Sequence, residues 1–253
     1  MSEQPENTLE RAGPLAWIRS GLYLVAFAIW AVIGCLGLLP FLIRREWATV
    51  AVRIWNTGNV VLAHVIAGVR CRVEGRENIP ASACIIASQH QSAWETYRVF
   101  VDLHYPVLVL KRELTRIPFI GWYMLRAGMV SIDRNAGASA MRKTMRAAKA
   151  ALGAGRHVVI FPEGTRAPPG VILPFRPGIA ALYLYCDVPV IPVAIDAGYF
   201  WGKNRFLKYP GHITVRFLPA LPAGLDKDEM LARLRESIAD GSRSLPGNQP
   251  PAA

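Results

Sequence analysis

The amino-terminal third of the chain is dominated by one long apolar run. Residues 22–43 contain no charged side chain, and arginines stand on both sides of the run. Because about 20 apolar residues suffice to cross the hydrocarbon core of a bilayer, the run predicts a membrane helix. Two glycines and Pro40 interrupt it, so a kinked helix or a half-buried hairpin also fits the pattern.

The next segment, residues 47–69, is apolar but carries an arginine, two asparagines and a histidine. This mixture is typical of an amphipathic helix at a membrane interface rather than of a second span. A buried hairpin in a soluble protein is an alternative, although few soluble helices run so long without a charge. The apolar run exceeds the h-region of a signal peptide, and no small-residue cleavage site follows it. We therefore expect a polar tail over residues 1–15 and a membrane-embedded helical arm over residues 16–68.

Beyond residue 68 the pattern changes to short apolar runs between turns and helix-length segments. It predicts strands at 69–74, 84–88, 106–110, 128–132, 158–161, 190–195 and 213–218, and helices at 139–152, 178–186 and 226–240. Strands that alternate with helices predict an α/β domain over residues 69–240, with a mostly parallel sheet flanked by helices. Residues 241–253, rich in Gly, Ser and Pro, are expected to form a disordered tail.

The net charge of +11 is concentrated in the middle of the chain, where residues 104–150 hold nine lysines and arginines against two acidic side chains. Nucleic acid, anionic lipid head groups and an anionic substrate are the three partners that such a stretch suits. No zinc-finger spacing or aromatic RNA-reading motif occurs, so nucleic acid is not expected. The neighbouring apolar arm favours the lipid surface.

Charge and cysteine usage also predict where the body lies. Arginines after the apolar run, against a net acidic amino terminus, place the body on the cytoplasmic side of the cell (inner) membrane. The four cysteines are scattered through apolar stretches without a CxxC motif. They are typical of buried thiols in a reducing compartment rather than of a disulfide framework.

Polar side chains recur where predicted strands end. These are His90, Lys111, Arg134 and the segment 163–166. Taken singly, Lys111 and Arg134 would be interpreted as solvent-facing cations. The carboxyl ends of parallel strands open onto one crevice, however, so we expect these groups to share a site.

His90 and Glu95 lie five positions apart after the predicted strand 84–88. They can meet only if His90 lies in the loop and a helix begins near Ser92, because residues five apart differ by about 140° around a helix. Ser92 and Glu95 have the spacing of a capping box, and in one interpretation Glu95 only caps that helix. In the other, Glu95 orients His90, which takes a proton from a substrate hydroxyl. Two ligands are fewer than a zinc site normally has and no HExxH motif occurs, so no metal is expected.

The segment Glu163-Gly164-Thr165-Arg166 has the chemistry of a phosphate-binding turn. Gly164 lets backbone amides approach an anion, Thr165 offers a hydroxyl, and Arg166 can bind two oxygens at once. Glu163 cannot bind phosphate directly, and we expect it to orient Arg166 or Lys111, or to pair on the surface. A base and a phosphate cradle that face one crevice suggest a transferase acting on a phosphorylated alcohol.

Four segments carry a family resemblance when they are taken together. They are His90-Gln91-Ser92-Ala93-Trp94-Glu95, Gly128-Met129-Val130-Ser131-Ile132-Asp133-Arg134, Phe161-Pro162-Glu163-Gly164-Thr165-Arg166 and Val188-Pro189-Val190-Ile191-Pro192-Val193. In this order they resemble the blocks of the glycerolipid acyltransferase family, whose best-known members are the 1-acylglycerol-3-phosphate acyltransferases. The resemblance extends over roughly residues 70–220. One departure is Glu95, because most members carry aspartate there.

The resemblance implies a membrane-bound acyltransferase that uses acyl-CoA or acyl carrier protein as co-substrate and needs no cofactor. His90 is then the base, Glu95 orients it, and Lys111, Arg134 and Arg166 hold the phosphate of a lysophospholipid acceptor. The expected acceptor is 1-acylglycerol-3-phosphate and the product phosphatidic acid. Glycerol-3-phosphate, a lyso-ornithine lipid or another lysophospholipid is an alternative acceptor, and a non-catalytic lipid-binding protein is an alternative of another class.

Overall fold

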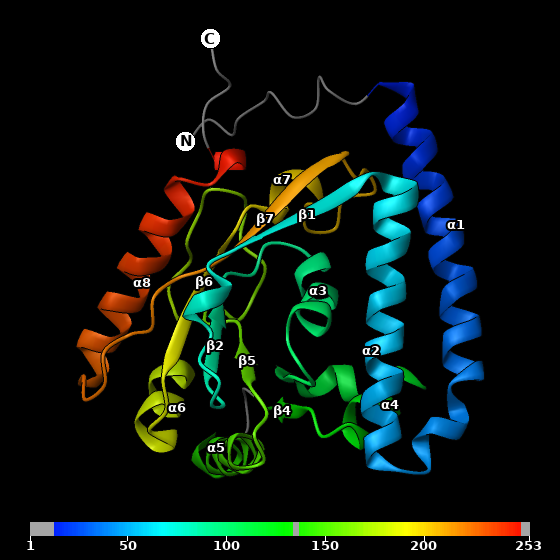
Figure 1. Cartoon of the computed structure of the whole chain (residues 1–253). Coiled ribbons are helices and arrows are strands. Elements are labelled where there is room, and N and C mark those ends of the chain that lie inside the picture. The colour runs from blue at the N-terminus through cyan, green and yellow to red at the C-terminus, as the bar shows by residue number, and fades with distance from the viewer. Residues whose placement is uncertain (1–12, 134–136, 249–253) are drawn as a thin grey trace.

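A seven-stranded sheet forms the centre of the molecule. The computed structural model describes residues 13–133 and 137–248. The strands are β1 (Val69–Glu74), β2 (Ile85–Ser88), β3 (Val107–Lys111), β4 (Val130–Ile132), β5 (Val158–Ile160), β6 (Val190–Ile195) and β7 (Gly211–Phe217). They lie in the order β1-β7-β6-β2-β5-β3-β4, and every neighbouring pair is parallel except β6 and β7 (Figure 1). The predicted mostly parallel α/β sheet is therefore confirmed.

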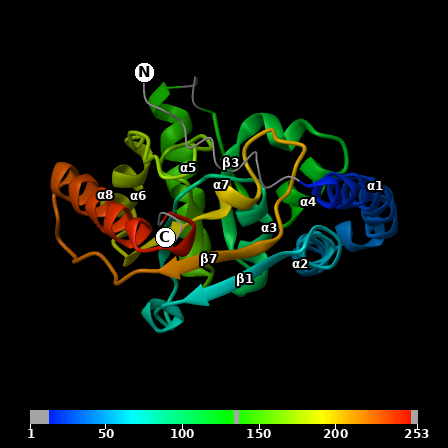
Figure 2. The same cartoon turned by 90° about the horizontal axis from the view of Figure 1, so that it is seen from above.

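Helices cover both faces of this sheet (Figure 2). One layer contains α5 (Gly137–Gly153), α6 (Gly178–Cys186) and α8 (Lys227–Arg243), and the other contains α2 (Arg45–Leu62), α3 (Trp94–Asp102) and α4 (Ile120–Arg126). Short helical turns complete the chain: η4 (Arg76–Asn78), η5 (Arg112–Arg116), α7 (Ala197–Phe200) and η6 (Pro246–Asn248). The predicted flanking of the sheet by helices is confirmed.

Alternation along the strands explains why both layers are needed. Ile86 of β2 and Val159 of β5 are buried in the core beneath α2 and α3. Their neighbours Ile85 and Val158 are buried in the core beneath α5, α6 and α8. Because successive side chains of a strand point to opposite faces, such continuous apolar strands require cover on both sides.

Most predicted boundaries agree with the structure to within a few residues. β1, β6 and α6 have the predicted bounds. β4 begins at Val130 rather than at Gly128, because Gly128 has a φ of 75°, which lies outside the strand region. α5 begins at Gly137, before the predicted cap at Ser139.

The amino-terminal arm is a helical hairpin. α1 (Pro14–Gly37) is followed by a turn that contains η2 (Leu39–Leu42), and then by α2, which continues through the π-helical segment η3 (Ala63–Ala67). The uncharged run 22–43 is therefore not one helix, since α1 ends at Gly37 and the chain then reverses direction (Figure 1). Of the alternatives that the sequence left open, the hairpin is the one observed.

α1 exposes an extensive apolar surface. Its side chains that are more than half exposed are Leu15, Trp17, Ile18, Leu22, Leu24, Val25, Ile29, Val32, Ile33 and Leu36. The helical stretches Pro14–Gly37 and Arg45–Ala67 are both long and apolar enough to cross a membrane, with mean hydropathies of 2.0 and 1.2. By length and composition alone this is weak evidence for membrane association. The exposed face of α1 adds to it, because contiguous apolar surfaces mark contact with a membrane or a partner.

α1 packs on α2 through two glycine–tryptophan contacts. A Cβ at Gly34 would lie 2.7 Å from the ring of Trp55, and a Cβ at Gly58 would collide with the ring of Trp30. The two indoles stack with their centroids 6.1 Å apart, and Trp30 Nε1 donates to the Trp55 carbonyl oxygen at 3.2 Å. The absence of side chains at the two glycines lets the helices approach this closely.

α2 is also part of the core of the body. Its Ala48, Ala51 and Val52 are buried in the same cluster as Trp94 and Phe100 of α3. The buried face of α2 is made mostly of small and polar residues, including Asn56 and Asn59. The sequence predicted an amphipathic helix at a membrane interface, and the structure packs this helix on the body instead. The arm and the α/β domain therefore share one hydrophobic core.

The prediction of a disordered tail from residue 241 onward is wrong up to residue 247. α8 continues to Arg243, Leu245 is fully buried, and the N–H of Gly247 donates to Oδ2 of Asp196 at 3.1 Å. One buried leucine and one buried carboxylate thus hold a segment whose Gly, Ser and Pro content suggested disorder. Residues 1–12 and 249–253, which hold most of the predicted polar tail and the end of the predicted disordered one, lie outside the described residues.

Leu245→Ala should lower the free energy of unfolding by about 2–5 kcal/mol, as expected for loss of a buried leucine side chain. Denaturant unfolding in detergent measures this. Leu184→Ala is the matched control, because Leu184 is 55% exposed on α6 and its loss should cost less than about 0.5 kcal/mol. A Leu245→Ala protein as stable as the wild type would show that the segment after α8 is not packed.

Candidate active site

His90 lies in the loop after β2, at the carboxyl edge of the parallel part of the sheet. β2 has β5 on one side and β6 on the other, and the loops after these strands open on the same edge. The N–H of His90 donates to Oε2 of Glu163 at 3.3 Å, and its carbonyl oxygen accepts from the N–H of Ala167 at 2.6 Å. The loop after β5 therefore holds both backbone groups of His90. The structure therefore brings the segment 90–95 and the segment 161–166 together.

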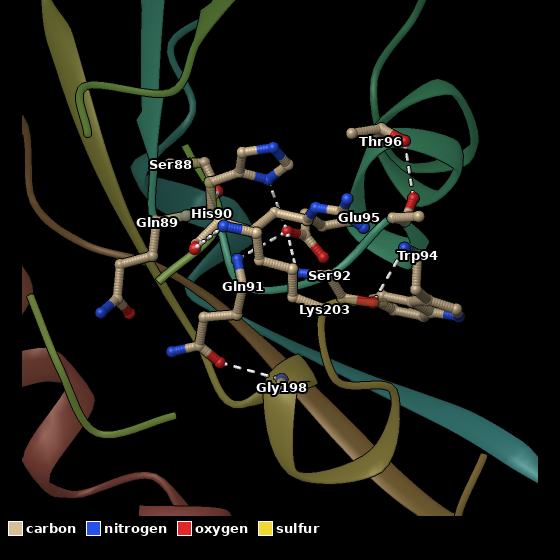
Figure 3. Close-up of polar contacts among 12 residues, drawn as sticks. Ser88, Gln89, His90, Gln91, Ser92, Trp94, Glu95, Thr96, Gly198 and Lys203 are labelled. Carbon is tan, nitrogen blue, oxygen red and sulfur yellow. Dashed lines mark hydrogen bonds and ion pairs between the residues drawn. The ribbon is translucent and has the colours of Figure 1, made fainter. Parts of the chain in front are cut away.

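Glu95 contacts the imidazole and caps the helix at the same time. Its Oε1 lies 2.8 Å from Nδ1 of His90 and accepts from the N–H groups of Gln91 and Ser92 at 2.8 and 2.7 Å (Figure 3). Oγ of Ser92 accepts from the N–H of Trp94 at 3.1 Å rather than from the N–H of Glu95, so only the glutamate half of the predicted capping box forms, and α3 begins at Trp94. The cap and the histidine contact, which the sequence presented as alternatives, coexist.

The imidazole of His90 is positioned from a second side by an aromatic ring. It stacks on Phe161 with the ring centroids 4.3 Å apart and an interplanar angle of 23°. The side chain is 18% exposed, and no described residue forms a hydrogen bond with Nε2. In the tautomer whose Nδ1 proton faces the carboxylate, Nε2 is the hydrogen-bond acceptor, which is the arrangement that a general base requires.

Two buried glutamines hold the His90 loop against β6 and α7. Oε1 of Gln89 accepts from the N–H of Ile195 at 3.0 Å, and Oε1 of Gln91 accepts from the N–H of Gly198 at 3.0 Å (Figure 3). Both glutamines are 1% exposed. His90 is thus flanked on each side by a residue that fixes the backbone of the loop.

The prediction that Glu163 orients Arg166 or Lys111, or pairs on the surface, is wrong. Glu163 is 2% exposed, and its Oε1 accepts from the N–H of Leu173 at 3.2 Å while Oε2 accepts from His90. Burial raises the pKa of Glu163 to about 7, and the two backbone hydrogen bonds oppose part of this rise. The carboxylate therefore joins the loops after β2 and β5 rather than lining an anion site.

The remainder of the predicted phosphate turn faces a loop that the sequence analysis missed. Gly164 has a φ of 68°, which a glycine adopts without strain. Arg166 Nη2 donates to Oδ1 of Asn204 at 3.1 Å, and Lys203 Nζ lies 3.4 Å from Oγ1 of Thr165. Lys203 and Asn204 follow α7, where no motif marks the chain. The one feature that could have pointed to them is their position after the predicted strand 190–195, which the structure places beside β2.

The other predicted cations are placed less closely. Lys111 is exposed at the carboxyl end of β3, the strand next to β5, and no described hydrogen bond joins it to the loop 163–166. Its neighbour Arg112 pairs with Asp133 at 2.8 Å. Arg134 lies outside the described residues. Among residues 13–133 and 137–248, no cluster of three or more His, Cys, Asp or Glu side chains could hold a metal ion.

An apolar cavity of about 260 Å³ begins beside α3. Thr96 and Tyr97 of α3, directly after Glu95, form part of its wall. Apolar side chains from α1, α2, β3, η5 and α4 form most of the rest, among them Phe27, Trp55, Leu108, Leu110, Ile117 and Met124. Such a lining suits a hydrocarbon chain.

The segments that build this site also carry the likeness to known proteins. The acyltransferase family model matches residues 70–196, half of the chain, and the match includes both loops around His90. The chain belongs to the acyltransferase family. It is an enzyme of acyl transfer, and His90, Glu95 and Arg166 all lie within the matched region.

This acyltransferase is similar over most of its length to proteins with a named reaction. A 1-acyl-sn-glycerol-3-phosphate acyltransferase of Pseudomonas aeruginosa is 38% identical over 201 residues, which cover 79% of this chain and 76% of that protein. The 1-acyl-sn-glycerol-3-phosphate acyltransferase alpha of Homo sapiens is 31% identical over 223 residues, or 83% and 79% of the two chains. The crystal structure of the 1-acyl-sn-glycerophosphate acyltransferase PlsC of Thermotoga maritima has the same fold, with a TM-score of 0.73 at 23% identity over 89% and 95% of the chains.

The raised pKa of Glu163 predicts how stability depends on pH. Below the ordinary pKa of 4.5 the carboxyl is protonated in both the folded and the unfolded chain. As the pH rises to about 7 the unfolded chain ionises first, so the folded state loses stability over this window. Relative to Glu163→Gln, which stands in for the protonated form, the wild type should lose up to about 3 kcal/mol of unfolding free energy between these pH values. Parallel pH profiles of the two proteins in detergent would contradict this.

Proposed function

We propose that this acyltransferase moves a fatty acyl group from a thioester to the free hydroxyl of 1-acylglycerol-3-phosphate and so forms phosphatidic acid. The observation that carries the proposal is the geometry of His90, which has Nδ1 on Glu95, Nε2 without a partner among the described residues, and a backbone held by the loop of Arg166. A base beside an anion-binding loop suits a phosphorylated alcohol. The names of relatives that are 38% and 31% identical support the same acceptor.

In the proposed reaction, Nε2 of His90 takes the proton of the acceptor hydroxyl as the oxygen attacks the thioester carbonyl carbon. Glu95 stabilises the imidazolium that forms. The tetrahedral intermediate collapses, the carbon–sulfur bond breaks, and the imidazolium returns the proton to the leaving thiolate. The thioester is already activated, so no serine or cysteine nucleophile is required and the transfer is direct.

The acceptor phosphate would bind at the turn that carries Gly164, Thr165 and Arg166. Arginine can bind two phosphate oxygens in parallel, and a hydroxyl and backbone amides add further donors. Lys111 would approach from the carboxyl end of β3, on the same edge of the sheet. Arg134, which the family resemblance assigns to the same phosphate, lies outside the described residues. Glu163 would act indirectly, because it accepts from the backbone N–H of His90 and so helps to position the base.

The apolar cavity beside α3 would receive the acyl chain of the donor, which can be acyl-CoA or acyl carrier protein. Thr96 and Tyr97 line the cavity and directly follow Glu95 in the sequence, so a chain lying there has its thioester end near the base. No cofactor is required by this chemistry, since the thioester supplies the activated carbonyl.

We further propose that α1 embeds the enzyme in the cell (inner) membrane from its cytoplasmic side. α2 packs on the body, and α1 lies outside α2 with its apolar face exposed (Figure 2). A hairpin held this closely against the body favours entry into one leaflet over a full span. A lysophospholipid could then reach His90 without moving its acyl chain through water.

Other acceptors remain compatible with the same chemistry. Glycerol-3-phosphate, a lyso-ornithine lipid and other lysophospholipids all offer a hydroxyl, and the ornithine lipid differs in having no phosphate. Acylation assays with a lysolipid panel and both thioester donors distinguish these. A non-catalytic lipid-binding protein is disfavoured, because the base and its carboxylate are intact and the chain belongs to a family of enzymes.

His90→Ala should lower kcat for phosphatidic acid formation by at least about 100-fold, the contribution expected of general-base catalysis. Glu95→Gln should also be strongly impaired, while Glu95→Asp should keep measurable activity because it retains a carboxylate. His104→Ala is the control, since His104 is an exposed histidine outside the site. Thermal unfolding of each protein separates loss of chemistry from loss of the helix cap. More than a third of the wild-type rate in His90→Ala would remove His90 from the mechanism.

The full-length enzyme should resist extraction from membranes by about 1 M salt and should need detergent, because hydrophobic insertion is not screened by ions. The double substitution Ile29→Lys and Ile33→Lys, at side chains that are 55% and 57% exposed on α1, should shift the protein toward the soluble fraction. Fractionation followed by immunoblotting measures both effects. Quantitative release of the wild type by salt alone would refute membrane embedding.

A further inference from the structure

A second cation lies at the proposed phosphate turn and comes from outside the matched family segment. Lys203 Nζ is 3.4 Å from Oγ1 of Thr165 and 3.5 Å from the carbonyl oxygen of Arg166. The adjacent Asn204 accepts from the Arg166 guanidinium at 3.1 Å. The loop after α7 and the turn after β5 therefore contact each other, and each contributes one cation. Figure 3 draws Lys203 together with the His90 loop.

Neither cation forms an ion pair with a carboxylate in the described part of the chain. Among the described residues, no carboxylate lies within 4.0 Å of the charged atoms of Lys203 or Arg166. The nearest acidic residue in the turn, Glu163, is buried and occupied by two backbone N–H groups. The contacts of Lys203 are also longer than the 2.7–2.9 Å typical of a charged N–H donor, so its ammonium retains capacity for a stronger acceptor.

The loop that carries Lys203 is fixed to α1. The N–H of Lys208 donates to the buried Oγ of Ser20 at 2.9 Å, and Phe206 stacks on Trp17 with centroids 5.6 Å apart. The ammonium of Lys208 lies over the ring of Trp201 at 5.1 Å. It also donates to the carbonyl oxygens of Arg205 and Phe206 at 3.2 and 2.8 Å, which fixes the turn of the loop. The helix with the exposed apolar face thus determines where Lys203 stands.

We propose that Lys203 is a second ligand of the acceptor phosphate, opposite Arg166, and that it selects phosphate monoesters over diesters. The proposal rests on the proposed function. A phosphate monoester carries a charge of about −1.5 to −2 near pH 7, whereas a diester carries one negative charge, so a second cation favours the monoester. 1-Acylglycerol-3-phosphate and glycerol-3-phosphate are monoesters, and lysophosphatidylglycerol is a diester.

The test uses purified full-length enzyme in detergent micelles, which removes the charge of a lipid surface. Lys203→Gln should raise the KM for 1-acylglycerol-3-phosphate roughly tenfold, as expected for loss of one charge-assisted contact, and leave the KM for acyl-CoA within about twofold. Lys203→Arg should restore most of the loss. The KM for lysophosphatidylglycerol, a diester, should change much less in Lys203→Gln. Arg205→Gln is the matched control, because Arg205 is an exposed cation of the same loop without a side-chain contact to Thr165 or Arg166 among the described residues.

Binding of glycerol-3-phosphate, measured as thermal stabilisation of the enzyme, distinguishes a failure of the proposed function from a failure of the proposed role of Lys203. Weaker binding to Lys203→Gln than to Arg205→Gln supports the role of Lys203 whatever the reaction. Wild-type enzyme that makes no phosphatidic acid overturns the proposed function alone. Active enzyme in which Lys203→Gln binds glycerol-3-phosphate and uses the monoester as the wild type does overturns the role of Lys203. Equal damage to acyl-CoA and acceptor kinetics would do so as well, because it indicates a general disturbance of the site.

Discussion

The active site depends on one constraint, the fixing of His90 by groups from separate parts of the fold. Glu163 and Ala167 hold its backbone from the loop after β5, Glu95 holds its ring from the start of α3, and Phe161 stacks on the ring. The contacts with Glu163, Ala167 and Phe161 exist because β2 and β5 are parallel neighbours whose carboxyl ends lie together. With its backbone held by two hydrogen bonds and its ring held by Glu95 and Phe161, His90 keeps one ring nitrogen free for a substrate, which is the requirement for a positioned base.

The same constraint explains the distribution of charge around the site. A buried carboxylate, Glu163, joins the two loops on the inside, and burial raises its pKa to about 7 because the surroundings disfavour its charge. On the outside, Arg166 and Lys203 face solvent without a carboxylate partner among the described residues. The acidic group of the turn thus serves the architecture, and the cations are left for a ligand. This separation would allow a turn that contains a glutamate to bind the proposed acceptor phosphate.

Local patterns were enough to predict the strands and most of the flanking helices, though not α4, and they offered the contact of His90 with Glu95 as one of two interpretations. These features follow from apolar periodicity and from the positions of strand ends, and both can be recognised from residues that are close in the sequence. The burial of Glu163 could not be predicted, because a glutamate beside a glycine looks solvated until the partner loop is known. Lys203 was missed for a related reason, since no motif marks its loop and its place beside Thr165 and Arg166 depends on contacts between segments that are distant in the sequence. Leu245 shows the limit of composition, because one buried apolar side chain outweighed a run of turn-forming residues.

The central claim is that a base held in this way acts on an acceptor bound through its phosphate. The most direct measurement compares the wild-type enzyme on 1-acylglycerol-3-phosphate and on 1-acylglycerol, with one acyl-CoA donor. The second acceptor has the same acyl chain and the same free hydroxyl at carbon 2, and it carries a hydroxyl in place of the phosphate at carbon 3. The account predicts phosphatidic acid from the first and at least about a hundredfold lower kcat/KM for the second, since several charge-assisted contacts are lost. Equal kcat/KM for the two acceptors would contradict it.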